Sequence, residues 1–559
     1  MNKQLLSIFA TLALLAVWSI GAHAQSFSVV YNFGSNPGDP LQQFYSGIIA
    51  QGRDGNLYSG SSAGGVLGYG AAYKITPAGV PTTLYSFSDN GDGSYPYGGL
   101  TLGTDGNFYG TAYSGGFGGA RYGTVFKETP GGAFSILYTF ADGTDGALPI
   151  SPPIQGTDGN FYGTTCTDCN GSAATGFGSI YRITTSGTFS VLYTCDGTIC
   201  YAPEGPLVQG TDGNFYGTSA YGGGFGNIFK ITSAGKLTVL YNFDSTHGAY
   251  PIAGLVQGSD GNFYGTTVDG GSKGAGVVFK ITPTGKITVL HNMNGATDGS
   301  APYAGLVQAT DGNLYGANEA GGAVSFDCPG GCGTLFKVTT KGAFSILYNF
   351  DQTTGQLPYS ALMQHTNGLI YGGTQLGGTG DVDISCSPGV CGVLYSLNIG
   401  APPFVSLVST SAKVGKTIEI LGQGFIGTTG VSFDGIAASF KVTSGTYLTA
   451  AVPTGAKTGS VTVATPSGTL TSNKTFRVTP QLTSFTPPSG AVGTPVTLTG
   501  FSLTQTTKVT FGGVAATSVV VNSDAQVTAN VPTGAKTGKI VITTPGGTAT
   551  SAAGFTVTP

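Results

Sequence analysis

Tyrosine and aspartate residues recur in the segments that join the repeated units of this chain, and together they have the chemistry of a sugar-binding site. A tyrosine ring can cover the apolar face of a pyranose while carboxylates accept hydrogen bonds from its hydroxyls. The same carboxylates could instead hold Ca²⁺, which prefers oxygen ligands. A third interpretation is structural, because Pro-Tyr and Asp-Gly pairs also turn the chain. The candidate ligand-binding residues are Asp89, Asp92, Tyr95, Tyr97, Asp142, Asp145, Asp244, Tyr250, Asp298, Tyr303, Asp351 and Tyr359.

Residues able to catalyse a reaction are scarce beyond these aspartates. After residue 24 the only histidines are His247, His291 and His365. One GxSxG match, at residues 60–64, follows a predicted hairpin and lacks the strand-turn-helix elbow of a hydrolase. We therefore predict no catalytic residues and no cofactor other than Ca²⁺. A pair of aspartates could still form the site of a lyase or hydrolase.

Eight cysteines occur as four close pairs, which predicts local disulfides in an exported protein. The pairs are Cys166 and Cys169, Cys195 and Cys200, Cys328 and Cys332, and Cys386 and Cys391. The CxxC at residues 166–169 also fits a redox or zinc site, but no thioredoxin-like βαβ pattern surrounds it. The pairing among the first four cysteines stays open, because four cysteines allow three pairings.

A repeated hairpin motif must position these connecting segments. The sequence DGNLY or DGNFY occurs at residues 54–58, 105–109, 158–162, 212–216, 260–264 and 311–315, and NGLIY follows at 367–371. Successive copies lie 48 to 56 residues apart. Asp-Gly between apolar runs predicts a hairpin with a primed turn, in which glycine takes a positive φ. Two more strand-like segments follow in each unit, so each unit predicts one four-stranded blade of a β-propeller.

The two ends of the repeat array predict a closed ring of seven blades. The last unit has only three strands, the third at residues 392–397. A matching fourth strand lies near the beginning of the chain, where FSVVYNF at 27–33 resembles FSILYNF at 344–350. A blade completed by both ends would close the ring. We therefore predict a seven-bladed propeller over residues 25–400.

The repeat period changes after residue 400. VSFDGIAA at residues 431–438 recurs as VTFGGVAA at 509–516, and VPTGAKTG at 452–459 recurs at 531–538. Segments of about 80 residues that are rich in valine and threonine, with regular turns, predict small β-sandwiches. We expect two immunoglobulin-like sandwiches, over residues 401–479 and 480–559, and an all-β protein.

These motifs resemble two known families. The unit GLVQGTDGNFYGTT, followed by FKIT and LYNF, resembles the Gloeobacter/Verrucomicrobia tandem repeat of exported bacterial propeller proteins. PSGAVG at residues 488–493, VTLTG at 496–500 and VTFGG at 509–513 resemble the IPT/TIG domain, whereas the first copy has SAKVG at 411–415 without the Pro-x-x-Gly lead. The resemblance implies extracellular binding or spacer modules and supplies no catalytic residues.

The N-terminal residues predict export. Lys3, an apolar run at residues 5–17 and the small residues Ala22 and Ala24 have the layout of a secretory signal peptide over residues 1–24. No second apolar run approaches the roughly 20 residues that cross a bilayer. The net charge of −4, without basic clusters, argues against nucleic acid as a partner. We expect a secreted or cell-surface protein.

The connections between predicted strands fall into a uniform and a variable set. In a propeller the hairpin turns share one face, and the other connections share the opposite face. Here the hairpin turns are uniform and the other connections are long and varied, and variable loops on a rigid scaffold usually carry binding residues. Our first hypothesis is a non-catalytic binding or adhesion protein for a glycan or an extracellular protein. The alternatives are a polysaccharide-active lyase or hydrolase and a structural component of the envelope or matrix.

Overall fold

The computed structural model describes residues 25–41, 47–116, 122–141, 143–167, 176–295, 297–322, 324–326, 328–380 and 391–559. Within these residues all regular elements are β-strands. No helix in this part of the chain is long and apolar enough to cross a bilayer. The predicted signal peptide, together with Asp142, Cys169 and Cys386, lies outside the described residues.

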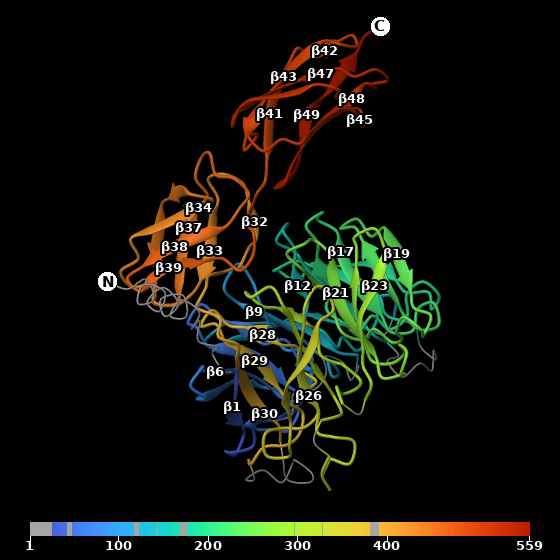
Figure 1. The fold of residues 1–559 in the computed structure, drawn as a ribbon, viewed down its shortest axis with the longest axis vertical. Helices are drawn as coiled ribbons and strands as arrows, with labels where there is room; N and C mark the ends of the chain where they lie inside the picture. The colour runs from blue at the N-terminus through green and yellow to red at the C-terminus, as the bar shows by residue number, and fades with distance from the viewer. Residues whose placement is uncertain are drawn as a thin grey trace, which may run out of the picture.

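The first four repeat units each form a four-stranded antiparallel sheet (Figure 1). Sheet 1 consists of β3 (Ala50–Gln51), β4 (Leu57–Ser61), β6 (Ala71–Ile75) and β7 (Pro81–Ser86). Sheet 2 consists of β8 (Thr101–Leu102), β9 (Phe108–Ala112), β10 (Thr124–Glu128) and β11 (Phe134–Thr139). Sheet 3 consists of β12 (Ile154–Gln155), β13 (Phe161–Thr165), β14 (Ser179–Ile183) and β15 (Phe189–Thr194). Sheet 4 consists of β16 (Val208–Gln209), β17 (Phe215–Ser219), β18 (Asn227–Ile231) and β19 (Leu237–Asn242).

Three more sheets of the same order follow. Sheet 5 consists of β20 (Val256–Gln257), β21 (Phe263–Thr267), β22 (Val277–Ile281) and β23 (Ile287–Asn292). Sheet 6 consists of β24 (Val307–Gln308), β25 (Leu314–Asn318), β26 (Thr334–Val338) and β27 (Phe344–Asn349). Sheet 7 consists of β28 (Met363–Gln364), β29 (Ile370–Gly373), β30 (Val393–Asn398) and the N-terminal strand β1 (Ser26–Asn32). β1 therefore occupies the place that the fourth strand of the unit has in the other sheets.

Aromatic side chains join neighbouring sheets at repeated positions. In sheets 1 to 4 the tyrosine of the second strand stacks on the phenylalanine that begins the second strand of the next sheet, as Tyr109 does on Phe161 with ring centroids 3.8 Å apart. The fourth strands make a second contact of the same kind, shown by Tyr85 and Phe134 at 3.9 Å. Stacked rings contribute about 1 kcal/mol beyond the area that they bury. These repeated contacts hold the sheets together through aromatic packing.

Sheet 7 contacts sheet 1 as well as sheet 6. The backbone N–H of Thr366 donates to Gln51 Oε1 over 3.0 Å, and Gln51 Nε2 donates to Thr366 Oγ1 over 2.8 Å. Sheets 3 and 4 are joined in the same way, through the N–H of Thr157 and Gln209. Phe27 of β1 stacks on Tyr348 of sheet 6 at 3.8 Å. The first and last repeat units are therefore neighbours through the same contacts that join successive units.

The Asp-Gly hairpin turns differ from the predicted primed turn. Gly55 has φ 79° while Asp54 does not have a positive φ, and the N–H of Gly55 donates to the carbonyl of Gly52. This is a turn closed by a glycine bulge, a common three-residue hairpin loop. Asp54 accepts the N–H of Asn56 through Oδ1 and the hydroxyl of Tyr58 through Oδ2. The repeated aspartate is therefore a turn-forming residue.

The C-terminal residues form two segments with corresponding strand orders. The first has one sheet of β31 (Ser406–Leu407), β33 (Thr417–Leu421), β37 (Tyr447–Ala451) and β36 (Phe440–Val442), and another of β35 (Ile436–Ala438), β34 (Gly430–Phe433), β38 (Val461–Thr465) and β39 (Gly468–Thr471). The second has β41 (Gln481–Thr486), β43 (Pro495–Phe501), β47 (Gln526–Asn530) and β46 (Val519–Ser523), and β42 (Ser489–Gly490), β49 (Gly547–Val557), β48 (Gly538–Thr544), β44 (Lys508–Phe511) and β45 (Val514–Ala515). Two short pairs, β2 (Pro40–Leu41) with β5 (Ala63–Gly64) and β32 (Ser411–Ala412) with β40 (Arg477–Val478), complete the strands.

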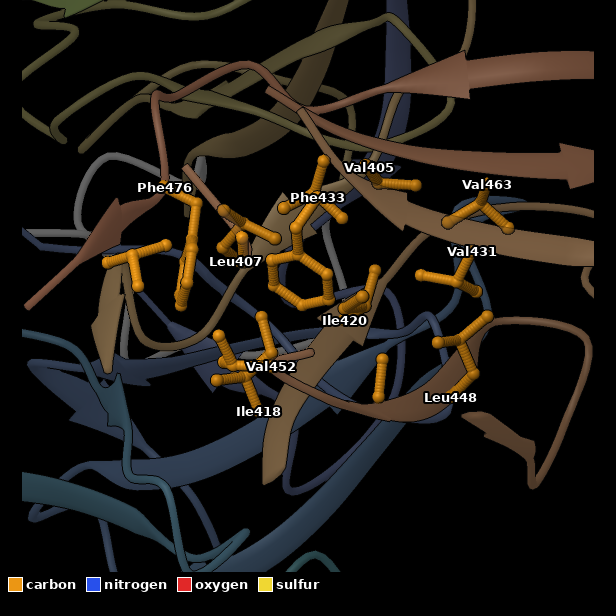
Figure 2. Packing of buried hydrophobic residues seen from close by; sticks show 14 of the residues in the cluster. Val405, Leu407, Ile418, Ile420, Val431, Phe433, Leu448, Val452, Val463 and Phe476 are labelled. Atoms are coloured by element: carbon orange, nitrogen blue, oxygen red, sulfur yellow. The ribbon is translucent and has the colours of Figure 1, made fainter. Parts of the chain in front are cut away.

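Each C-terminal segment has its own apolar core. Figure 2 shows the first, in which Phe433 and Phe476 lie among aliphatic side chains from both sheets. The alternating burial of β33 and β37 places every second side chain in this core, as period-two strands require. A separate cluster fills the second segment. In Figure 1 the second segment (red) lies at the end of the molecule away from the repeat sheets.

The first C-terminal segment docks on the hairpin turns of the repeat sheets. Arg53 in the turn of sheet 1 binds Glu419 of β33 with two hydrogen bonds, Nη2 to Oε1 at 2.5 Å and Nε to Oε2 at 3.1 Å. The Arg53 guanidinium also lies 5.0 Å from the ring centroid of Tyr447. On sheet 7 the carbonyl of Thr366 accepts the N–H of Phe404. A bidentate pair stacked on an aromatic ring is a specific contact rather than a loose surface pair.

A further contact reaches sheet 4. Arg477 donates from Nη1 to the carbonyl of Thr211, over 2.6 Å, in the hairpin turn of that sheet. The first C-terminal segment therefore contacts sheets 1, 4 and 7 on the side that carries the Asp-Gly turns. We call this side the turn face, and the side that carries the other connections the loop face. The turn face is already partly covered within the chain itself.

The Arg53 contact leads to a prediction about how the segments are held together. Arg53→Ala removes both hydrogen bonds to Glu419 and the contact with Tyr447, so the first C-terminal segment should loosen by about 1–2 kcal/mol. We expect limited proteolysis to cleave the connection at residues 398–404 several-fold faster. Arg182→Ala in β14 is the control, since it removes an arginine outside this contact. Unchanged cleavage in Arg53→Ala would show that the ion pair does not hold the segment.

Candidate ligand-binding loops

The loop face is one continuous surface because two kinds of connection pair with each other. The connections between sheets pair with the loops between second and third strands, through single bridges such as Ser94 with Ser114, Ala249 with Asp269, Ser300 with Ala320 and Gln356 with Leu376. Every tyrosine in the predicted site lies in a connection between sheets. The pairing places these tyrosines beside residues that follow the second strand of the next sheet.

A strained residue recurs in six of these connections, each time directly before a proline. The φ angles are 57° at Tyr95, 55° at Leu148, 51° at Ala202, 57° at Tyr250, 53° at Ala301 and 53° at Leu357. A residue before proline is normally extended, so a left-handed conformation there is unfavourable by about 1–3 kcal/mol. Two backbone hydrogen bonds compensate, because the N–H of Tyr95 donates to Tyr69 of sheet 1 while its carbonyl accepts the N–H of Tyr113 of sheet 2. The strained residue therefore links two neighbouring sheets.

Three predicted aspartates are bound to the fourth strand of their own sheet. Asp92 accepts the Tyr85 hydroxyl over 2.8 Å, and Asp145 accepts the Tyr138 hydroxyl over 3.0 Å. At the equivalent place Asp298 lies 2.6 Å from Nε2 of His291, so the histidine takes the place of the tyrosine. Each carboxylate also accepts a backbone N–H of its own loop. These contacts agree with the structural interpretation of these aspartates.

The other described aspartates of the predicted site close short turns. Asp244 accepts the N–H of His247, and this hydrogen bond, with smaller contributions from the side chains of His247 and Thr246, lowers the pKa of its carboxyl to about 2. Asp351 accepts the N–H groups of Thr353 and Thr354. Asp89 accepts the Ser94 hydroxyl over 3.0 Å. Asp89 shares its connection with Asp92, whereas Asp244 and Asp351 each lie in a different connection.

The tyrosines of the predicted site do come together, and with partners that the sequence did not point out. Tyr97 lies against Tyr113, with ring centroids 4.8 Å apart, and Tyr250 lies 5.5 Å from Tyr221. Tyr221 in turn lies 5.3 Å from Tyr201. Tyr113, Tyr201 and Tyr221 pack on one buried cluster that includes Ile150 and Cys166. Residues from sheets 2 to 5 thus meet in one aromatic group.

A second aromatic pair comes from the connections that precede sheets 6 and 7. Tyr303 and Tyr359 pack edge to face at 5.1 Å. The Tyr359 hydroxyl donates to Glu319 Oε1 over 2.7 Å. All of these rings are half-buried, so each keeps part of its surface open to solvent. We call Tyr97, Tyr113, Tyr201, Tyr221, Tyr250, Tyr303 and Tyr359 the loop-face tyrosines.

Glu204 is the acidic group closest in chain position to this aromatic group. It follows Pro203 in the connection between sheets 3 and 4, at the position that Tyr97 and Tyr303 have in other connections. Its side chain is only 6% exposed, and burial raises its pKa to about 8. Within the described residues its carboxyl has no hydrogen-bond partner. Burial therefore favours the protonated form of Glu204.

Disulfides fix some of the loops around these residues. Cys195 bonds Cys200 and Cys328 bonds Cys332, as local pairing predicts. Cys166 and Cys391 are also disulfide-bonded. Among the described residues no group of three or more His, Cys, Asp or Glu side chains is arranged to hold a metal ion.

Sequence reasoning found half of the aromatic group. Tyr97, Tyr250, Tyr303 and Tyr359 were predicted, whereas Tyr113, Tyr201, Tyr221, Glu204 and Glu319 were not. The signal that could have found three of them is positional: Tyr113 and Glu319 directly follow a second strand, and Tyr221 lies one residue further on. The N–H groups of Tyr113 and Glu319 donate to the strained residues Tyr95 and Ala301, and the N–H of Tyr221 donates to Tyr201, so these positions face the connections between sheets.

The repeat model of the Gloeobacter/Verrucomicrobia family matches residues 16–227, 169–386 and 224–429. The chain belongs to the Gloeobacter/Verrucomicrobia repeat family. The IPT/TIG domain model matches residues 480–558, so the second C-terminal segment of this family member is an IPT/TIG domain. A search of curated proteins finds no match.

Several solved structures share parts of the chain at low identity. SGBP-B from a complex xyloglucan utilisation locus in Bacteroides uniformis is 21% identical, with 27% of this chain and 48% of that chain covered and a TM-score of 0.15. The surface glycan-binding protein PbSGBP-B from Prevotella bryantii is 18% identical over 27% and 41% of the two chains, with a TM-score of 0.22. A fungal alcohol oxidase of the AA5 family, in complex with copper, is 13% identical over 82% and 100%, with a TM-score of 0.42. At these TM-scores the function has to be argued from the residues of the chain itself.

Proposed function

We propose that this protein is a secreted or cell-surface binding protein that recognises carbohydrate through the loop-face tyrosines. The observation that carries the proposal is the convergence of half-buried tyrosines from sheets 2 to 5 into one aromatic group. An aromatic ring that is partly open to solvent can pack on the apolar face of a pyranose. Glu319, which accepts the Tyr359 hydroxyl, adds a carboxylate beside one of the rings.

We further propose that the seven repeat sheets are the blades of one closed propeller over residues 25–400, with two immunoglobulin-like sandwiches at residues 401–479 and 480–559. The contacts of sheet 7 with both sheet 6 and sheet 1 support the closed arrangement. In this arrangement the docked first sandwich occupies the turn face. Ligand therefore approaches from the loop face, where the variable connections lie.

Substitution of the tyrosines tests the binding proposal. Tyr303→Ala and Tyr359→Ala each remove a half-buried ring from the loop face. Each should weaken glycan binding by about fivefold to thirtyfold, since an aromatic contact is worth about 1–2 kcal/mol. The measurement is calorimetric titration of residues 25–559 with oligosaccharides found on a glycan array, with calcium and with EDTA. Tyr193→Ala, in the fourth strand of sheet 3, removes a tyrosine outside the loop-face tyrosines and is the control. Equal affinity in all three variants would contradict the proposed site.

A non-catalytic role is part of the proposal. Within the described residues the histidines are committed to local contacts, since His247 bonds Asp244, His291 bonds Asp298 and His365 bonds the carbonyl of Gly55. The described aspartates of the predicted site bind groups of their own connection or of the preceding strand, whereas hydrolysis of a glycosidic bond needs two carboxyls facing one sugar. Release of products from a broad polysaccharide panel by the purified protein would overturn this part of the proposal.

A further inference from the structure

Acidic and basic residues are unevenly distributed along the sequence of this chain. The segments that connect the repeated hairpins hold sixteen of the 26 acidic residues but only two of the 22 lysines and arginines, Arg121 and Lys273. In the sequence these segments are residues 33–49, 62–70, 87–100, 113–123, 140–153, 166–178, 195–207, 220–226, 243–255, 268–276, 293–306, 319–333, 350–362 and 374–392. The net charge of −4 is therefore the sum of acidic connecting segments and a basic remainder of the chain.

The described part of the loop face has the same imbalance. Its acidic residues are Asp39, Asp89, Asp92, Asp145, Asp196, Glu204, Asp244, Asp269, Asp298, Glu319 and Asp351, and its only lysine or arginine is Lys273. Asp244 and Asp351 are exposed, and backbone hydrogen bonds within their turns contribute to holding the pKa of each carboxyl below its usual value. Charges of one sign on one face produce a potential that attracts cations and repels anions. The field acts even though individual carboxylates are bound in local turns.

The acidic field surrounds rings that themselves attract cations. The faces of tyrosine rings interact favourably with an ammonium group within about 6 Å. Tyr359 already combines such a ring with a carboxylate, because its hydroxyl binds Glu319. Glu204, buried and without a hydrogen-bond partner among the described residues, adds a carboxyl oxygen that can accept a hydrogen bond from an approaching ammonium group. Half-buried rings, unbalanced carboxylates and a recessed acid are together the chemistry that binds an amine.

We propose that the loop face binds a cationic amino sugar, a pyranose that carries a free ammonium group, and rejects uronic acids and sulfated sugars. This inference rests on the proposed carbohydrate-binding function and names the class of sugar. An anionic sugar would bring like charges together, which weakens binding and slows association. A basic peptide would meet the same field, but a lysine side chain offers no flat face to the rings. The flat apolar face of a pyranose uses both features of the site.

Four oligosaccharides of equal length test the proposal on residues 25–559. The probes are hexamers of β-1,4-linked glucosamine, N-acetylglucosamine and glucose, with a hexamer of galacturonic acid, titrated at 0.02 M and 0.3 M salt. We expect the glucosamine hexamer to bind at least about tenfold tighter than the two neutral hexamers at low salt, and this advantage to shrink at high salt through screening. The galacturonate hexamer should not bind.

The outcomes separate this inference from the proposed function. Equal binding of the glucosamine and glucose hexamers would overturn the amino-sugar inference and leave carbohydrate binding intact. Tighter binding of galacturonate would also overturn it. Binding of hexalysine without binding of any sugar would overturn both and would favour a basic protein as the partner. Failure of all probes to bind would count against both.

A charge-neutralising pair of variants locates the effect on the loop face. Asp244→Asn with Asp351→Asn removes two exposed negative charges, while each asparagine keeps the oxygen that accepts the backbone N–H groups of its turn. We expect about a threefold to tenfold loss of affinity for the glucosamine hexamer at low salt and little change at high salt. Asp434→Asn with Asp524→Asn makes the same change of charge in the C-terminal segments and should leave the affinity unchanged. An equal loss in both double variants would show that net charge alone is responsible.

Discussion

Replacing Glu128 by isoleucine is expected to stabilise the repeat sheets by about 3 kcal/mol at pH 7. Glu128 is the last residue of β10, is fully buried, and neither carboxyl oxygen has a hydrogen-bond partner. Burial raises its pKa to about 8. The corresponding positions of the other third strands are apolar, with Ile75, Ile183, Ile231, Ile281, Val338 and Leu397 in place of the acid. An isoleucine side chain should therefore fit at residue 128, because the corresponding positions of the other sheets hold isoleucine or another aliphatic residue.

The pH dependence follows from the direction of the pKa shift. A carboxyl whose pKa is higher in the folded state binds its proton more tightly when the protein is folded. The free energy of unfolding is therefore highest below the unfolded pKa of about 4.5, where the carboxyl is protonated in both states. Stability falls as the pH rises from about 4.5 to about 8, where the buried carboxyl also begins to ionise, and then becomes constant. The isoleucine variant lacks this loss, so its advantage over the natural chain should grow over the same interval.

Denaturant unfolding at pH 5, 7 and 8.5, followed through the transition of the repeat sheets, measures this difference. Glu128→Gln is the matched control, because it removes the titration but keeps an unsatisfied polar group in the same place. It should share the flat pH profile and gain less stability than isoleucine. An isoleucine variant whose advantage is the same at pH 5 and pH 8.5 would show that Glu128 is ionised or hydrogen-bonded in the folded protein.

The all-β architecture could be predicted from the sequence because the same hairpin motif occurs seven times. Seven copies of one motif average out the ambiguity of any single strand, and the match of residues 27–33 with 344–350 pointed to the strand that pairs with β30. The exact turn was wrong, since Asp54 uses its side chain to hold the N–H of Asn56 instead of adopting a positive φ. Side-chain hydrogen bonds of this kind compete with backbone preferences, and a dipeptide rule does not include them.

The candidate site was only partly predictable because contacts between sheets define it. The tyrosines before and after the prolines could be identified as loop residues, but their partners come from other loops. Tyr113, the partner of Tyr97, follows the second strand of the next sheet, and Tyr221, the partner of Tyr250, follows the second strand of the preceding sheet. The aspartates were harder still. Asp92 lies six residues after the end of β7 and binds a strand tyrosine, whereas Asp244 lies two residues after the end of β19 and closes a turn.

The docking of the first C-terminal segment was not visible in the sequence either. Arg53 stands where other repeats have threonine or serine before the Asp-Gly pair. That single substitution supplies the guanidinium that binds Glu419 and lies beside Tyr447. A module predicted as a spacer is therefore tied to the repeat sheets, and this leaves the loop face as the open surface.

Replacing Phe27 by alanine is expected to destabilise the repeat sheets as much as the same change at Phe134, by about 2–3 kcal/mol. The two residues have the same surroundings. Phe27 stacks on Tyr348 at 3.8 Å with an angle of 7° between the rings, and Phe134 stacks on Tyr85 at 3.9 Å with the same angle. Phe350 and Tyr395 lie around Phe27 as Phe87 and Phe126 lie around Phe134. Only the position in the chain differs, since Phe27 lies near its beginning.

This difference makes the pair a test of closure of the repeat array. If β1 stays bound to β30, loss of the Phe27 ring removes a contact that holds sheets 6 and 7 together, and the whole array should melt at a lower temperature. If β1 separates easily from β30, sheets 6 and 7 are not held together by Phe27. Phe27→Ala will then change the melting temperature much less than Phe134→Ala. Calorimetric melting of both variants distinguishes these cases, with protease digestion of the N-terminal strand as the second readout. Equal destabilisation together with a protected β1 is the result expected for a closed propeller, because a ring has no free end from which its sheets can separate.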